Sequence, residues 1–179
     1  MNFNKNIMPD SIGLIIIGEG TDAVIKYATS SSEAKTTLAN ELEMLGEESY
    51  GHMFISTDNF ELFVDDQLVG LCLVSVDFEH DDDLPELFAT LSLDAVVLHP
   101  EYRGLGLGSE FVEKAMVTAF GLINPQCVQD GYNAVSLICL ADFMSLEGES
   151  VFHHGYSAIK QASKKNTSIK YDISMDACF

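Results

Sequence analysis

The stretch from Leu91 to Phe120, LSLDAVVLHPEYRGLGLGSEFVEKAMVTAF, constrains this chain more than any other. An apolar run ends at His99-Pro100, glycines follow at three alternate positions, and apolar residues then recur at helical spacing. The order is strand, glycine loop, helix. The N–H groups of such a loop and the positive end of the helix converge on one point, which suits an anionic phosphate. We therefore predict a phosphate-binding loop at Gly104, Gly106 and Gly108, where the missing Cβ lets a ligand approach the backbone.

A second glycine pair competes for this role. A short apolar strand, Ile12 to Ile17, precedes Gly18-Glu19-Gly20-Thr21-Asp22-Ala23, which matches the dinucleotide fingerprint G-x-G-x-x-A. Glu19 would place a negative charge inside the anion site. The following segment, Asp22 to Leu45, reads as helical, and the acidic Glu41 and Glu43 fall in helical context, whereas the fingerprint needs a second strand. A nucleotide-binding Rossmann domain stays the alternative, and preferential binding of NAD would support it.

The rest of the chain alternates strands and helices, and no linker divides it. A length of 179 residues suits a single domain with one core. The first predicted elements are a loose arm at 1–10, a helical pattern at 22–45, an irregular segment at 47–58 and a hairpin of 60–64 with 68–78. The helical pattern is broken near 29–32, where Ser31 or Ser32 would cap a second helix. The later elements are a strand at 89–98, a helix at 109–121, a loop at 123–132, a strand at 134–141, a short helix at 150–156, and a closing hairpin of 156–161 with 168–175.

The charge of the chain limits its partners. The formal net charge is −19, and Arg103 is the single basic residue between Thr36 and Glu113. Such a surface repels phosphate backbones, so we do not expect a nucleic-acid partner. It would attract a cationic acceptor such as an amine, although the same acidity serves solubility equally well.

Hydropathy and cysteine usage indicate a reduced, cytoplasmic protein. No apolar run approaches the roughly 20 residues that span a bilayer, and the first residues do not read as a signal peptide. The four cysteines lack CxxC spacing, and Cys72 and Cys139 sit in apolar runs, as core thiols do. We also expect no metal site, because the adjacent His153 and His154 would point about 100° apart on a helix, and Asp81-Asp82-Asp83 lacks the alternating ligands of a calcium loop.

The order of elements and the stretch Val97 to Ser109, VLHPEYRGLGLGS, resemble the GNAT acyltransferase superfamily over nearly the whole chain. The acyl-CoA motif of that superfamily, R/Q-x-x-G-x-G/A, is met in full by Arg103-Gly104-Leu105-Gly106-Leu107-Gly108. The resemblance implies a mixed α/β fold, with a splayed and mainly antiparallel central sheet flanked by helices on both faces. It also implies transfer of an acetyl group from acetyl-CoA to a primary amine, by direct attack in a ternary complex.

The resemblance assigns the acyl-donor site to the end of the strand and the loop. N–H groups from Arg103 through Ser109 would bind the pyrophosphate of CoA at the start of the helix, and Arg103 would contribute through its backbone as much as its charge. The strand ending at Val97 and Leu98 would pair with the pantetheine arm, and a bulge would splay it from the strand at 134–141. A backbone N–H near Leu98 would stabilise the oxyanion.

The catalytic residues of the superfamily are less well matched. Many relatives carry a glutamate where this chain has Ser92, so Asp94, acting directly or through a water, is our candidate base, with Asp77 and Glu79 as rivals. The usual proton-donating tyrosine aligns with Val151, next to Phe152, and neither can donate a proton.

Tyr156 is therefore the candidate acid, and His153 and His154 are alternatives. Because of these departures, a CoA-binding regulatory protein without catalysis is the second hypothesis. A homodimer is compatible with this fold.

Overall fold

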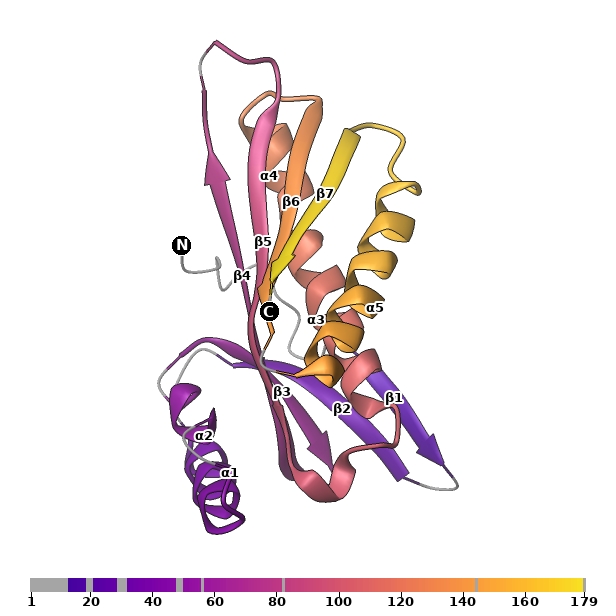
Figure 1. The fold of residues 1–179 in the computed structure, drawn as a ribbon. Coiled ribbons are helices and arrows are strands. Elements are labelled where there is room, and N and C mark those ends of the chain that lie inside the picture. The colour runs from indigo at the N-terminus through magenta and orange to yellow at the C-terminus, as the bar shows by residue number, and fades with distance from the viewer. Residues whose placement is uncertain are drawn as a thin grey trace. The chain divides into compact units, whose positions relative to one another are not determined.

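The computed structural model describes residues 13–18, 21–28, 32–47, 50–55, 57–81, 83–143 and 145–178 (Figure 1). The predicted arm at 1–10 lies outside these residues. The chain forms two compact units, which we describe separately. The glycine-loop unit contains the residues up to Leu73 together with Ala95–Phe111, and the parallel-strand unit contains Val74–Asp94 together with the residues from Val112 onward.

Antiparallel strands form the sheet of the glycine-loop unit. They are β1 (Gly13–Gly18), β2 (Thr21–Ala28), β3 (Asn59–Val64) and the first part of β4 (Gln67–Glu79), paired in that order. Asp65 and Asp66 close the β3–β4 hairpin with φ values of 47° and 63°, as a primed two-residue turn requires. The predicted hairpin is confirmed.

The prediction of a helix from Asp22 onward was wrong for its first part. Ala23 and Ile25 are fully buried while Asp22 and Lys26 are exposed, which is the two-residue period of a strand. Gly18 pairs with Thr21, so a strand and not a helix follows the first glycine. The Rossmann alternative requires a helix after these glycines, and the chain instead forms a strand from Thr21. Glu19 and Gly20 themselves lie outside the described residues.

The helical pattern holds from α1 (Glu33–Met44) onward. Ser32 caps this helix, with its Oγ accepting the Lys35 N–H at 3.2 Å, as the sequence predicted. Gly46, with φ of +79°, ends it. A short helix that the sequence did not predict, α2 (Tyr50–Met53), follows. Apolar side chains of α1 pack into a core with strand residues and with the residue that follows α2. The buried members of this core are Leu38, Leu42, Phe54, Leu68, Leu71 and Val97.

A buried ion pair joins α1 to β3. Lys35 is fully buried, and its Nζ donates to the Thr57 carbonyl at 3.1 Å and lies 3.6 Å from Glu61 Oε1. Burial lowers the pKa of Lys35 and raises that of Glu61, while their mutual attraction opposes both shifts. Each charge depends on the other because removing one would leave an uncompensated buried charge.

Parallel strands define the other unit. The first part of β5 (Leu87–Leu98) pairs with β6 (Ala134–Asp142), and β6 pairs with β7 (Lys170–Cys178), in both cases in parallel. The β5–β6 pairing ends at Leu93 and Ala141, although β5 continues to Leu98, as a splayed sheet predicts. The helices of this unit are α3 (Leu107–Phe120, from Val112), α4 (Ile123–Gln129) and α5 (Leu146–Ser163), and α5 runs alongside β7 (Figure 1).

The predicted closing hairpin was wrong, and the predicted short helix was too short. Residues 156–161 belong to α5, and β7 joins β6 in parallel through that helical crossover. Ser145 caps α5 by accepting the Gly148 N–H at 3.0 Å, and Phe152, Gly155 and Ile159 form its buried stripe. The predicted loop at 123–132 likewise contains α4. The fold class, mixed α/β with a largely antiparallel, splayed sheet flanked by helices, agrees with the prediction.

Candidate functional site

The glycine loop connects the end of β5 to the start of α3, as the sequence predicted. The His99 N–H donates to the Val69 carbonyl of β4 at 2.8 Å, which fixes the end of the strand. One turn of 3₁₀ helix, η1 (Pro100–Tyr102), follows. Gly104 and Gly106 then adopt φ values of +75° and +79°, a left-handed conformation that residues with a Cβ rarely take. Left-handed residues of this kind occur in anion-binding loops, where successive N–H groups converge on one side.

The start of α3 adds further N–H donors directly after the loop. The Glu110 N–H closes onto the Gly106 carbonyl at 3.4 Å. The N–H groups of Leu107, Gly108 and Ser109 come before the first complete turn, so the helix supplies them no acceptor. A Cβ placed on Gly104 or Gly106 would meet nothing within 4 Å, so the space beside both backbones is open. We call Arg103–Ser109 the cradle. The Arg103 N–H itself donates to the Pro100 carbonyl at 3.1 Å, so the donors that could meet an anionic diphosphate begin at Gly104.

The last residues of β5 present a backbone edge next to the cradle. The His99 N–H and the Val97 carbonyl are directed toward β4, since the latter lies beside Gly70. Backbone groups alternate sides along a strand, so those of Leu98 point away from β4. The Leu98 N–H could pair there with a further extended chain, as the pantetheine prediction requires, while the Leu98 carbonyl already accepts from Arg103 Nε at 2.9 Å. Val97 is itself buried in the core and supports this edge.

Arg103 does not leave its guanidinium free. Its Nε donates to the Leu98 carbonyl at 2.9 Å, and its Nη1 donates to Glu47 Oε1 at 2.8 Å. The side chain of the residue that opens the motif is thus held by acceptors of the chain itself. The sequence prediction missed Glu47, whose signal was its position directly after the helix-ending Gly46.

In the parallel-strand unit, Asp94 of β5 lies next to two polar residues of β4. Desolvation of its carboxyl group raises the pKa of Asp94, and the neighbouring Asp77 carboxylate raises it further, whereas a hydrogen bond from Ser75 lowers it. The residue as a whole remains exposed. A carboxylate with a raised pKa is a better proton acceptor than an ordinary one. The rival Glu79 lies exposed at the end of β4, and Ser92 is half-buried.

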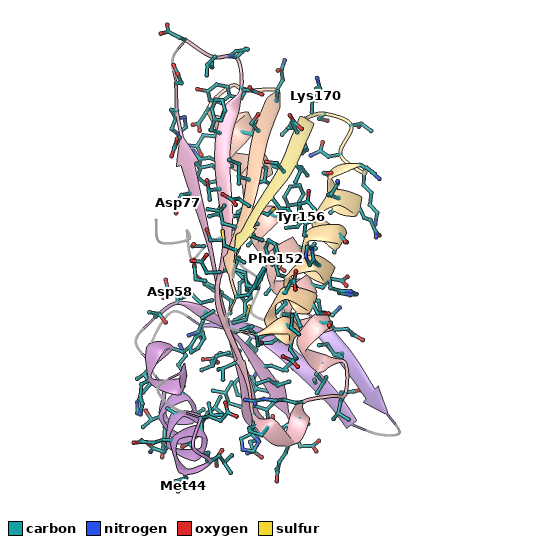
Figure 2. The ribbon with its side chains drawn as sticks, in the orientation of Figure 1. Met44, Asp58, Asp77, Phe152, Tyr156 and Lys170 are labelled. Atoms are coloured by element: carbon teal, nitrogen blue, oxygen red, sulfur yellow. The ribbon has the colours of Figure 1, made fainter. Side chains whose placement is uncertain are left out.

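The candidate acid lies on α5. The Tyr156 hydroxyl donates to the Ile173 carbonyl of β7 at 3.4 Å, and its ring stacks on Phe152 with centroids 6.4 Å apart (Figure 2). Half-buried Val151 precedes this aromatic pair. Each neighbouring histidine lies beside a glutamate, with His153 Nε2 3.6 Å from Glu149 Oε1 and His154 Nε2 2.8 Å from Glu113 Oε2.

An acidic hollow of about 560 Å³ lies at the β4–β5 connection of the same unit. Its lining residues are Glu79, His80, Asp81, Asp83, Leu84 and Phe88. His80 also lies 3.8 Å from Asp130. Asp81 and Asp83 of the acidic run therefore border a concave surface, and Asp82 lies outside the described residues. Within the part of the chain that the structure describes, no His, Cys, Asp and Glu side chains gather as a metal site would need, and no helix is long and apolar enough to cross a membrane.

A glycine loop between a strand and a helix, on a mixed sheet flanked by helices, is the architecture that the resemblance to the GNAT superfamily implied. A model of the acetyltransferase (GNAT) family matches residues 24–137, and the chain belongs to that family. No curated protein matched the sequence.

Three of the solved structures that are similar to this chain carry acetyltransferase names. A ribosomal-protein-alanine N-acetyltransferase from Brucella melitensis biovar Abortus 2308 shares 12% identity over 72% of this chain and 88% of its own, with a TM-score of 0.40. The aminoglycoside N-acetyltransferase AAC(6')-Iy, in complex with CoA, shares 11% over 80% and 90%, with a TM-score of 0.33. An aminoglycoside acetyltransferase from an uncultured soil metagenomic sample, in complex with sisomicin, shares 10% over 85% and 97%, with a TM-score of 0.36.

Proposed function

We propose that the protein is an N-acetyltransferase that transfers an acetyl group from acetyl-CoA to a primary amine. The cradle supports this proposal most directly, because two left-handed glycines precede the start of α3 in a chain that belongs to the GNAT family. Backbone N–H groups from Gly104 to Ser109 hold the diphosphate, and the edge at Leu98, which the buried Val97 supports, pairs with the pantetheine arm. When bound, acetyl-CoA supplies the activated acyl group.

The catalytic half of the proposal assigns proton transfer to Asp94. An alkyl ammonium is not a nucleophile, so a base must accept its proton, and the raised pKa of Asp94 suits that role. Tyr156 stays the candidate acid, although a thiol pKa near about 8.5 makes the thiolate a tolerable leaving group without one. A single domain over 1–179, a cytoplasmic setting and a homodimer also stay predictions, and the family match includes residues of both units.

Calorimetry tests whether the protein binds acetyl-CoA, the proposed acyl donor. Titration of acetyl-CoA to millimolar concentration should give saturable binding, and CoA should compete for the same site. NAD is the matched control because it also carries a diphosphate but lacks the pantetheine arm. Absence of acetyl-CoA binding, or preference for NAD, would falsify the proposed function.

Acceptor turnover separates the enzyme from its alternative, a CoA-binding regulatory protein. Val151 at the position of the usual tyrosine and the engagement of Tyr156 by Ile173 favour that alternative. A panel containing a polyamine, an aminoglycoside, a free amino acid and a peptide amine, followed by release of free CoA thiol, decides between them. Turnover on any acceptor excludes the regulatory reading, whereas tight binding of CoA without turnover across the panel favours it.

A further inference from the structure

The side chain of Arg103 is held at two points, and both lie in the glycine-loop unit. Nε donates to the carbonyl of Leu98, the last residue of β5, at 2.9 Å, and Nη1 donates to Glu47 Oε1 at 2.8 Å. Hydrogen bonds between charged groups of this length are roughly twice as strong as neutral ones. The guanidinium therefore links the end of the strand, the start of the cradle and the segment after α1.

Glu47 is placed by the way α1 ends. With Gly46 left-handed, the Gly46 N–H donates to the Glu43 carbonyl and the Glu47 N–H donates to the Leu42 carbonyl, both at 3.0 Å. This is the double hydrogen bond of a glycine-terminated helix. Leu42 is itself fully buried in the core that also contains Val97 of β5. The carboxylate therefore reaches Arg103 from a fixed backbone.

Two of the five N–H donors of the only guanidinium in the sequence are engaged within the chain, one by the Leu98 carbonyl and one by Glu47. The Arg103 side chain is 44% exposed and that of Glu47 is 30% exposed, so both are partly shielded from solvent. The hydrogen bond from Arg103 is the main cause that lowers the pKa of Glu47, so the carboxylate stays ionised near neutral pH. A guanidinium with its charge balanced in this way offers little net attraction to a phosphate.

We infer that Glu47 is a positioning residue of the cradle, which holds Arg103 against the Leu98 carbonyl so that the loop meets the diphosphate with backbone N–H groups and not with the guanidinium. This inference rests on the proposed function, because the cradle is taken to bind acetyl-CoA. The competing arrangement is one in which Arg103 leaves Glu47 and contacts phosphate directly.

Three variants separate these arrangements. Glu47→Gln keeps the shape but removes the charge. Arg103→Gln places Nε2 at the same number of bonds from Cα as Nε, so it preserves a donor for the Leu98 carbonyl and loses the one for Glu47. Glu43→Gln is the matched control, since it removes an exposed pair with His52 (3.3 Å) at the same end of α1.

Two measurements are made on each full-length variant. Amide hydrogen exchange over 104–109 in the free protein reports the order of the loop, and calorimetry reports the Kd for CoA. For Glu47→Gln we expect exchange to accelerate about twofold to fivefold and CoA affinity to fall by a similar factor, the range of a partly exposed ion pair. The double variant Glu47→Gln with Arg103→Gln should bind CoA no more weakly than Arg103→Gln alone, because the two substitutions break the same ion pair.

Opposite results overturn the inference. Tighter CoA binding by Glu47→Gln would mean that Arg103, once released, contacts phosphate itself. Exchange or affinity unchanged from the Glu43→Gln control would mean that the pair does not position the loop. If the native protein bound no CoA, the proposed function would fail, and the exchange measurement would still decide whether Glu47 orders the loop.

Discussion

At the scale of single residues, two neighbours move the pKa of Asp94 in opposite directions. Desolvation raises that pKa first, the Asp77 carboxylate adds to the rise, and the Ser75 hydroxyl opposes it. A base works only when it is deprotonated, so a raised pKa moves the loss of activity to a higher pH than an ordinary carboxyl, with a pKa of about 3.9, would give. Substitution of either neighbour therefore changes the pH dependence without touching the base.

We predict that the acidic limb of kcat/KM shifts upward in Ser75→Ala and downward in Asp77→Asn. Removal of the Ser75 hydrogen bond further destabilises the charged form of Asp94, and removal of the Asp77 charge stabilises it. Asp94→Asn should lower kcat by about 10²-fold to 10⁴-fold with little change in the KM for acetyl-CoA. Rates against pH for the three variants check this. Shifts in the same direction for both neighbours, or full activity in Asp94→Asn, would assign the base elsewhere.

At the scale of elements, the two glycines before α3 carry the geometry of the cradle. Gly104 and Gly106 are left-handed although the space beside them is open, so the backbone and not crowding demands glycine there. Gly131, in the turn between α4 and β6, has the same φ of +80° and equally open space, and it belongs to the parallel-strand unit. It therefore provides a matched position outside the cradle.

We predict that Gly104→Ala, Gly106→Ala and Gly131→Ala each destabilise the fold by about 1–2 kcal/mol, because a Cβ is strained in that conformation. Only the first two should weaken CoA binding, by about tenfold or more, since they disturb the N–H groups that face the ligand. Thermal unfolding and calorimetry measure the two effects separately. Equal CoA affinity in all three variants would show that the cradle does not bind the diphosphate.

The boundaries of helices and strands could be predicted where the backbone chemistry of one residue sets them. They could not be predicted where tertiary packing sets them. The cap at Ser32 and the stop at Gly46 follow from local backbone chemistry, and both were readable. The segment at 21–28 combines a two-residue period with residues that also suit a helix, and its pairing with β3 decides the outcome. The closing hairpin failed because α5 extends across a segment whose alternation looked like a strand.

At the scale of the whole molecule, the backbone geometry of the cradle could be predicted from the sequence, whereas the side-chain partners of its residues could not. The glycine spacing fixes the cradle in sequence, whereas the partnership of Glu47 with Arg103 joins residues 56 positions apart. No local sequence pattern predicts the buried Lys35–Glu61 pair either, because a lysine on an amphipathic helix normally faces water. Such contacts depend on the tertiary fold.

Net charge makes a prediction at the same scale. With −19 on the chain, added salt should lower kcat/KM for a polycationic amine, by roughly tenfold between low and high ionic strength, and should leave or improve the affinity for anionic acetyl-CoA. A monoamine acceptor is the control, since its weaker attraction should give a smaller salt effect. Steady-state rates across a sodium chloride series measure both. Parallel salt effects on donor and acceptor would show that net charge does not govern their approach.

Arg103 can be modified selectively, and its two hydrogen bonds control how fast it reacts. Because this is the only arginine in the sequence, a guanidinium-selective reagent such as phenylglyoxal addresses one site, at the entrance to the cradle. Its reaction rate reports how often the side chain leaves both acceptors, Leu98 and Glu47. An arginine-specific protease would likewise cut between Arg103 and Gly104 alone, so one band pattern on a gel follows the opening of this loop without any label.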